Sequence, residues 1–174
     1  MRLFALFGLI ALLAPQPVAA SCAAGSVPAY TDIRYISVRQ FSWVGNVRPG
    51  FEVEGVDLPW RSNITLKGFR SVPLIGTYVA ADPRGLFQAL TAVLERNRFL
   101  DMQLTVLEKC CTLDGPEDSV SVARCGVGTT VGTLPPENGI FDENSQTAAF
   151  KALEEQLRQV IFSAKWNPAD VKRK

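Results

Sequence analysis

Four segments that alternate polar and apolar residues come before the first helical segment, and this order limits the fold more than any other feature of the sequence. Alternation with a period of two is typical of strands with one buried face, and the Gly- and Pro-containing stretches between them predict turns. Strands are therefore predicted at residues 33–40, 51–56, 63–68 and 73–79. A Rossmann-like or TIM-like fold is excluded because strands and helices do not alternate regularly.

The first predicted helix begins with Asp82 as an acidic N-cap and Pro83 at the first helical position. Apolar residues then recur at helical spacing and form one stripe, which consists of Leu86, Phe87, Leu90, Val93 and Leu94. After this helix the pattern returns to strands, predicted at residues 99–111 and 119–125, with a hairpin or a bulged continuation at 126–134.

The last predicted element is a second amphipathic helix, followed by Trp166, which is expected to pack back on the domain. The apolar side of this helix carries Phe150, Leu153, Leu157, Val160 and Ile161. On the opposite side, two pairs have the spacing of solvent-exposed i,i+4 ion pairs: Lys151 with Glu155, and Glu154 with Arg158. The whole order predicts the α+β class, with an antiparallel β-sheet and two amphipathic helices packed on one face as a two-layer sandwich.

The N-terminus has the features of a secretory signal peptide, predicted at residues 1–20. Its apolar run at 3–14 is too short to span a bilayer as a helix, and Val18-Ala19-Ala20 supplies small residues before the cleavage site. No other segment is apolar enough to be a membrane span. We therefore expect a flexible arm at 21–30, a single domain at 31–167 and a basic tail at 168–174, in the periplasm or secreted. Two alternatives are a lipid anchor on Cys22 and cleavage after Ala24.

Four cysteines follow Ala20, and in an oxidising compartment an even number predicts structural disulfides. They are Cys22, Cys110, Cys111 and Cys125. Adjacent residues of a strand point to opposite faces, so Cys110 and Cys111 need different partners: one is expected to reach Cys125 and the other Cys22. A redox role for Cys110 and Cys111 is the alternative, and it would require a strained vicinal bridge or a reactive thiolate.

The chain contains no histidine, which excludes Ser-His-Asp triads, Cys-His nucleophiles and His-ligated zinc or haem. The cysteines lack a C-x-x-C spacing, so we expect no metal and no other cofactor. Basic and acidic residues are nearly balanced, 18 against 17, without a concentrated basic surface. Nucleic acid is therefore not an expected partner.

Two groups of residues are candidates for a function. The first is a binding patch, because tryptophan and arginine are enriched where proteins bind partners; it consists of Trp43, Trp60, Arg48 and Arg61. The alternative is that both tryptophans only cover the edge of the sheet. The second group could supply a carboxylate pair for glycoside hydrolysis, and its members are Glu52, Glu54, Asp57, Asp114, Glu117 and Asp118. The alternative is that these residues only occupy a solvent face and a turn.

Several short features follow one another in a characteristic order between Ile33 and Trp166. They are Lys67-Gly68, Gly76-Thr77-Tyr78, Leu90 and Leu94 before Arg98-Phe99, Asp114-Gly115-Pro116, and Lys165-Trp166. In this order the chain resembles a family of small exported bacterial domains of unknown function. Relatives carry a Cys-Phe-Gly-x-Cys-Pro-x-Tyr segment after the first strand, whereas residues 41–51 here keep a Gly, a Pro and an aromatic residue but no cysteine. The resemblance implies the fold class and an envelope location, and it implies no reaction.

The sequence thus predicts a non-enzymatic exported envelope domain that binds another envelope or secreted protein, in the manner of an inhibitor or immunity-type protein. The alternative is a small carboxylate-dependent hydrolase of the cell envelope. The position of the side chains separates the two hypotheses. A hydrolase requires two acidic side chains that converge, whereas a binding domain requires an exposed aromatic surface.

Overall fold

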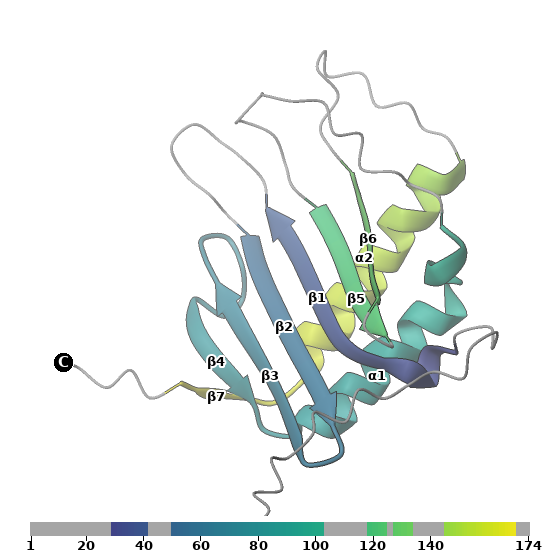
Figure 1. Ribbon diagram of the computed structural model, residues 1–174. Helices are drawn as coiled ribbons and strands as arrows, with labels where there is room; N and C mark the ends of the chain where they lie inside the picture. Colours follow the sequence, from purple (N-terminus) through teal and green to yellow (C-terminus); the bar gives the residue numbers. More distant parts are fainter. Residues whose placement is uncertain (1–28, 42–49, 103–117, 125–126, 134–144, 170–174) are drawn as a thin grey trace, which may run out of the picture.

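Seven antiparallel strands form one sheet in the order β6-β5-β1-β2-β3-β4-β7 (Figure 1). The computed structural model describes residues 29–41, 50–102, 118–124, 127–133 and 145–169. The strands are β1 (Ile33–Phe41), β2 (Gly50–Leu58), β3 (Arg61–Gly68), β4 (Gly76–Ala80), β5 (Asp118–Arg124), β6 (Val127–Thr133) and β7 (Trp166–Pro168). β1 is an inner strand of the sheet and lies between β2 and β5.

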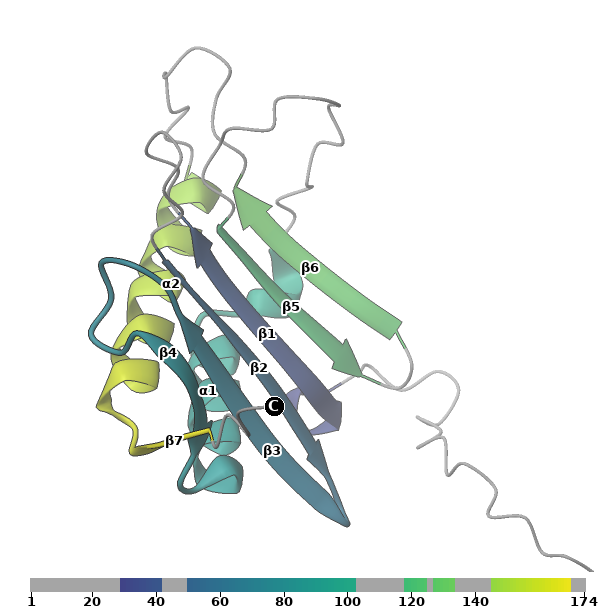
Figure 2. The ribbon, with the colours of Figure 1, turned by 90° about the vertical axis from the view of Figure 1, so that its left-hand side faces the viewer.

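Two helices, α1 (Pro83–Arg96) and α2 (Ser145–Ser163), lie on the same face of the sheet (Figure 2). As predicted, α1 begins after Asp82, whose side chain accepts a hydrogen bond from the backbone N–H of Gly85. The short 3-10 helices η1 (Tyr30–Asp32) and η2 (Phe99–Asp101) precede β1 and follow α1. The predicted α+β sandwich is confirmed. Within the described residues, no helix is long and apolar enough to cross a membrane.

The core lies between the sheet and the helices. Alternate residues of the central strands point toward the helices, and Ile36, Val38 and Val53 are inaccessible to solvent. The whole apolar stripe predicted for α1 is buried. The same holds for four residues of α2: Phe150, Leu153, Leu157 and Ile161. Burial of each large apolar side chain is worth about 1.5–3 kcal/mol, so this interface holds the two layers together.

Two strand predictions are corrected by the structure. Residues 99–101 were expected to begin a strand, but they form η2 because Arg98 adopts a left-handed conformation (φ 53°) that turns the chain after α1. The remainder of that predicted strand lies outside the described residues. The interruption expected at residues 57–60 is only a two-residue turn, since Leu58 pairs directly with Arg61 and the hairpin is continuous.

The prediction for Glu154 is wrong. It was expected in solvent beside Arg158, but its side chain lies between α2 and the sheet and the residue is 6% exposed. The reason is the width of the buried side of α2, which includes both Leu153 and Glu154 one turn after Phe150.

Candidate binding surfaces and a buried carboxyl group

Two members of the predicted binding patch, Trp60 and Arg61, lie at the β2–β3 turn. Trp60 is 69% exposed, which makes it the most exposed large apolar residue among those described. The other two members, Trp43 and Arg48, lie outside the described residues. The described neighbours of their segment, Phe41 and Gly50, are at the other end of β2 from Trp60, about 27 Å away along the strand.

A second exposed surface, which the sequence analysis missed, lies at that other end of the sheet. It is formed by the loop between β3 and β4. In this loop Ile75 is 65% exposed and Phe69 is 37% exposed. Arg70 and Pro73 are also exposed. We call these four residues, Phe69, Arg70, Pro73 and Ile75, the β3–β4 loop surface.

Backbone hydrogen bonds fix the first half of this loop against the start of β2. The N–H of Gly50 donates to the carbonyl of Arg70 at 3.1 Å, and the N–H of Phe69 donates to the carbonyl of Gly50 at 2.9 Å. The ring of Phe69 also packs edge-on against that of Phe41, with 5.5 Å between ring centroids. The surface therefore adjoins the two residues from which the segment with Trp43 and Arg48 departs.

The second half of the loop is held by contacts with the core and with the side chain of Tyr78. Val72 and Leu74 are partly buried and pack against the core, while the Tyr78 hydroxyl donates to the carbonyl of Ile75 at 3.0 Å. Gly68 permits this path, because a Cβ at that position would overlap the carbonyl oxygen of Leu74. The alternation of Val72 and Leu74 with Pro73 and Ile75 was interpreted as the start of a strand. In the structure it divides the loop into an anchored side and an exposed side.

A cluster of polar residues, of which Glu154 is buried and the other three are partly buried, lies on the covered face of the sheet, where β1 and β5 meet α2. We call it the carboxyl cluster: Gln40, Asp118, Glu154 and Arg158. Gln40 and Asp118 are neighbours across the β1–β5 pairing. Arg158 donates from Nη1 to Oε1 of Gln40 at 3.5 Å, which leaves the amide group of Gln40 to interact with the carboxyl group of Glu154. Oε1 of Glu154 makes no hydrogen bond with any described residue.

The environment of the carboxyl cluster favours the protonated form of its acids. Burial and, to a smaller extent, the charge of Asp118 together raise the pKa of Glu154 to about 8, against smaller opposing effects of Gln40 and Lys151. Burial also raises the pKa of Asp118 above its ordinary value. Arg158 adds a positive charge nearby and lies over the rings of Phe51 and Phe162, 5.9 and 5.4 Å from their centroids.

Of the six carboxylates predicted as catalytic candidates, three on β2 lie away from this cluster. Glu52 binds Arg39 at 2.8 Å and Lys67 at 3.5 Å on the open face, and Asp57 binds Arg84 at 3.3 Å. Glu54 lies on the same open face as Glu52 and is half-buried. Asp114 and Glu117 lie outside the described residues. Among the four candidates that the structure describes, Asp118 is the one whose charge acts on a buried acid, and that acid is Glu154, which was not among the candidates.

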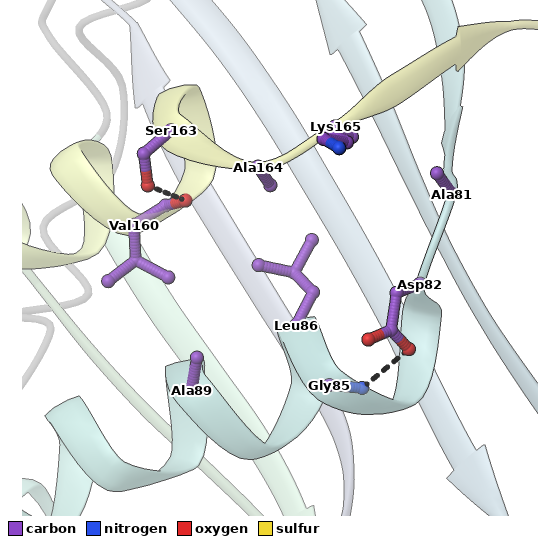
Figure 3. A pocket seen from close by; sticks show the side chains of 9 residues that line it. All are labelled: Ala81, Asp82, Gly85, Leu86, Ala89, Val160, Ser163, Ala164 and Lys165. Atoms are coloured by element: carbon purple, nitrogen blue, oxygen red, sulfur yellow. Dashed lines mark hydrogen bonds between the residues drawn. The ribbon is translucent and has the colours of Figure 1, made fainter.

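A groove of about 360 Å³ separates the start of α1 from the end of α2 (Figure 3). Its lining includes Asp82 and Ser163, but both side chains cap backbone groups: Asp82 accepts from the N–H of Gly85, and Ser163 donates to the carbonyl of Val160, each at 3.0 Å. A depression of about 290 Å³ lies beside Tyr30, whose hydroxyl accepts from the N–H of Leu100. Neither contains a member of the carboxyl cluster.

The four cysteines predicted to form disulfides, Cys22, Cys110, Cys111 and Cys125, all lie outside the described residues, so their pairing stays a prediction. Among the described residues, no group of three or more His, Cys, Asp or Glu side chains could hold a metal ion.

Comparison with known proteins assigns no family to the chain. No protein-family model matches it, and searches of curated proteins and of solved structures also give no match. The resemblance to exported bacterial domains therefore stays a prediction.

Proposed function

We propose that this chain is an exported, non-enzymatic domain that binds another envelope or secreted protein through the β3–β4 loop surface. The observation that carries the proposal is the exposure of Phe69 and Ile75 on a loop whose backbone is fixed at both of its ends. The two residues adjoin the paired Gly68 and Gly76 at the two ends of this loop, and a group of exposed apolar side chains is typical of interaction sites. The export part of the proposal is supported by the predicted signal peptide.

The fixed backbone matters because a loop that is already ordered loses little conformational entropy when a partner binds. Arg70 adds a donor next to the apolar residues, and arginine is one of the residue types that contribute most to binding energy. Trp60 has greater exposure but stands on a hairpin turn at the far end of β2. It therefore provides a matched control.

The test uses the mature chain from residue 21, immobilised and exposed to envelope extract of the source organism. Wild type, the double variant Phe69→Ser/Ile75→Ser and the control Trp60→Ser are compared, with thermal unfolding to verify that each is folded. We expect wild type and Trp60→Ser to retain the same protein from the extract. The double variant should bind this protein at least tenfold more weakly, which corresponds to about 1.4 kcal/mol of binding free energy. If the captured protein is a secreted enzyme, addition of the domain should lower its activity.

Equal retention by the double variant would contradict the proposed surface. If Trp60→Ser alone lost the bound protein, the binding site would be at the β2–β3 turn and not on the β3–β4 loop surface. If wild type retained no protein, the proposed function would be contradicted.

The alternative function, a carboxylate-dependent hydrolase, has one observation in its favour: Asp118 and Glu154 lie close enough that the charge of one raises the pKa of the other. A hydrolase also requires substrate and water to reach both acids, whereas Glu154 is 6% exposed. The test is release of reducing ends from cell-wall glycan by wild type, Asp118→Asn and Glu154→Gln. We expect no release by any of them, and release by wild type that Glu154→Gln abolishes would establish the alternative.

A further inference from the structure

The two edges of the sheet are built differently. The β7 edge has only three residues and ends at Pro168, which has no N–H to donate to a further strand. The β6 edge has seven residues, and all seven pair with β5 without a register shift. Within the described part of the chain, no strand lies on the outer side of β6 (Figure 2).

β6 also lacks the features that normally prevent a strand edge from pairing. It contains no charged residue and no proline, and five of its seven residues are Val or Thr, which favour strands. Val127 is 63% exposed, and Thr130 is exposed on the open face. A regular, uncharged edge of this length is a template for another strand.

The sequence of β6 is complementary to itself in the antiparallel direction. With Thr130 opposite its own counterpart, Gly128 lies opposite Gly132 and Thr129 opposite Val131. The β-branched side chains then meet across the strands on the covered face, and the two threonines meet on the open face; both kinds of cross-strand pair are favourable.

Charge also favours a second copy as the partner. A strand with charges would bring like charges together when it meets itself, but β6 has none.

We propose that the outer edge of β6 pairs antiparallel with β6 of a second copy of this chain, with Thr130 on the two-fold axis, so that the two sheets join into one. Stable interfaces bury roughly 1,200–2,000 Å² of surface. A seam of one seven-residue strand buries less than this, so the association is weak and depends on concentration.

The test is sedimentation of the mature chain between about 1 μM and about 1 mM, which spans the range of weak dimers. Thr130→Lys places two lysines opposite each other on the axis, and Thr77→Lys adds the same charge to the exposed face of β4, away from the seam. We expect wild type and Thr77→Lys to dimerise alike and Thr130→Lys to raise the dissociation constant at least tenfold. A wild-type monomer throughout this range, or unchanged dimerisation of Thr130→Lys, would overturn the proposal.

A measurement on wild type alone covers the case in which Thr130→Lys fails to fold. Hydrogen exchange should show that the outward-facing amides of β6 become more protected as the concentration rises. Protection that is the same at every concentration would overturn the proposal: constant high protection would show that another part of the same chain covers the edge, and constant low protection that the edge stays unpaired.

Discussion

The two faces of the sheet give glutamate side chains opposite environments. On the open face, the carboxylate of Glu52 is contacted by Arg39 and Lys67, and it stays in touch with solvent, with 14% of the side chain exposed. On the covered face, Glu154 is buried with one oxygen lacking a hydrogen-bond partner among the described residues, and its pKa is raised. Where water is near, two cations stabilise the charge. Where it is excluded, protonation is the favourable state.

The largest effect should come from the covered face, where packing dominates. Leu157 of α2 is inaccessible to solvent, so Leu157→Ala removes contacts and leaves a cavity. We expect a loss of about 2–5 kcal/mol in the free energy of unfolding, measured by urea denaturation. Thr65→Ala on the open face is the control and should change it by less than about 0.5 kcal/mol. Similar losses of unfolding free energy in both variants would show that packing contributes equally on the two faces.

A pH-dependent effect is expected for Glu154. Its pKa is about 8 in the folded protein and close to the ordinary value of 4.5 in the unfolded chain. Between these values the folded state binds more protons, so stability rises as the pH falls from 8 toward 4.5 and is lost as the pH rises. The slope from this group is about 1.4 kcal/mol per pH unit at most.

Glu154→Gln keeps the shape of the side chain and cannot ionise. We expect thermal unfolding of this variant to lose most of the pH dependence between 5 and 8, and the variant to be more stable than wild type at pH 8 and above. A smaller slope of the same sign should remain, because the pKa of Asp118 is also raised. An unchanged profile in the variant would show that the protonation of Glu154 does not control stability.

A moderate effect is expected at the start of α1, whose apolar stripe covers part of the sheet. Asp82→Ala removes the hydrogen bond that the N–H of Gly85 donates to the side chain of Asp82. This should cost about 1 kcal/mol in urea denaturation. Asp82→Asn retains an acceptor at the cap and should stay close to wild type; an equal loss in both variants would argue for a role of the charge instead.

The smallest effect should come from the ion pairs of the open face. Glu52→Gln weakens the contacts with Arg39 and Lys67, both of which are about half exposed. We expect a loss below about 1 kcal/mol that shrinks as salt is added. A loss that persists in high salt would mean that Glu52 acts through packing and not through charge.

The sequence predicted the parts of the fold that depend on a single periodic pattern. The cap at Asp82 and the stripe from Leu86 to Leu94 follow from local rules, and both are confirmed. Glu154 could not be placed correctly, because a polar residue at the border of an apolar helix face is buried or exposed according to what packs against it. The pairing of Gln40 with Asp118, which forms half of the carboxyl cluster, joins distant parts of the chain and leaves no local signal.

The β3–β4 loop surface was missed for a different reason. Residues 73–75 alternate like a strand, but Gly76 is the first residue that pairs with β3, opposite Gly68. The loop before it leaves the sheet because Ser71 adopts a left-handed conformation (φ 63°), which the sequence pattern does not reveal.

The position of β1 between β2 and β5 has a consequence for the order of folding. Its partner β2 follows directly in the chain, whereas its other partner, β5, is reached only after β3, β4 and α1. Contacts between nearby segments form with a smaller loss of entropy, so the meander β1–β4 with α1 should assemble first. Until β5 arrives, one side of β1 stays unpaired. Self-association of the refolding chain should therefore be greatest during that interval.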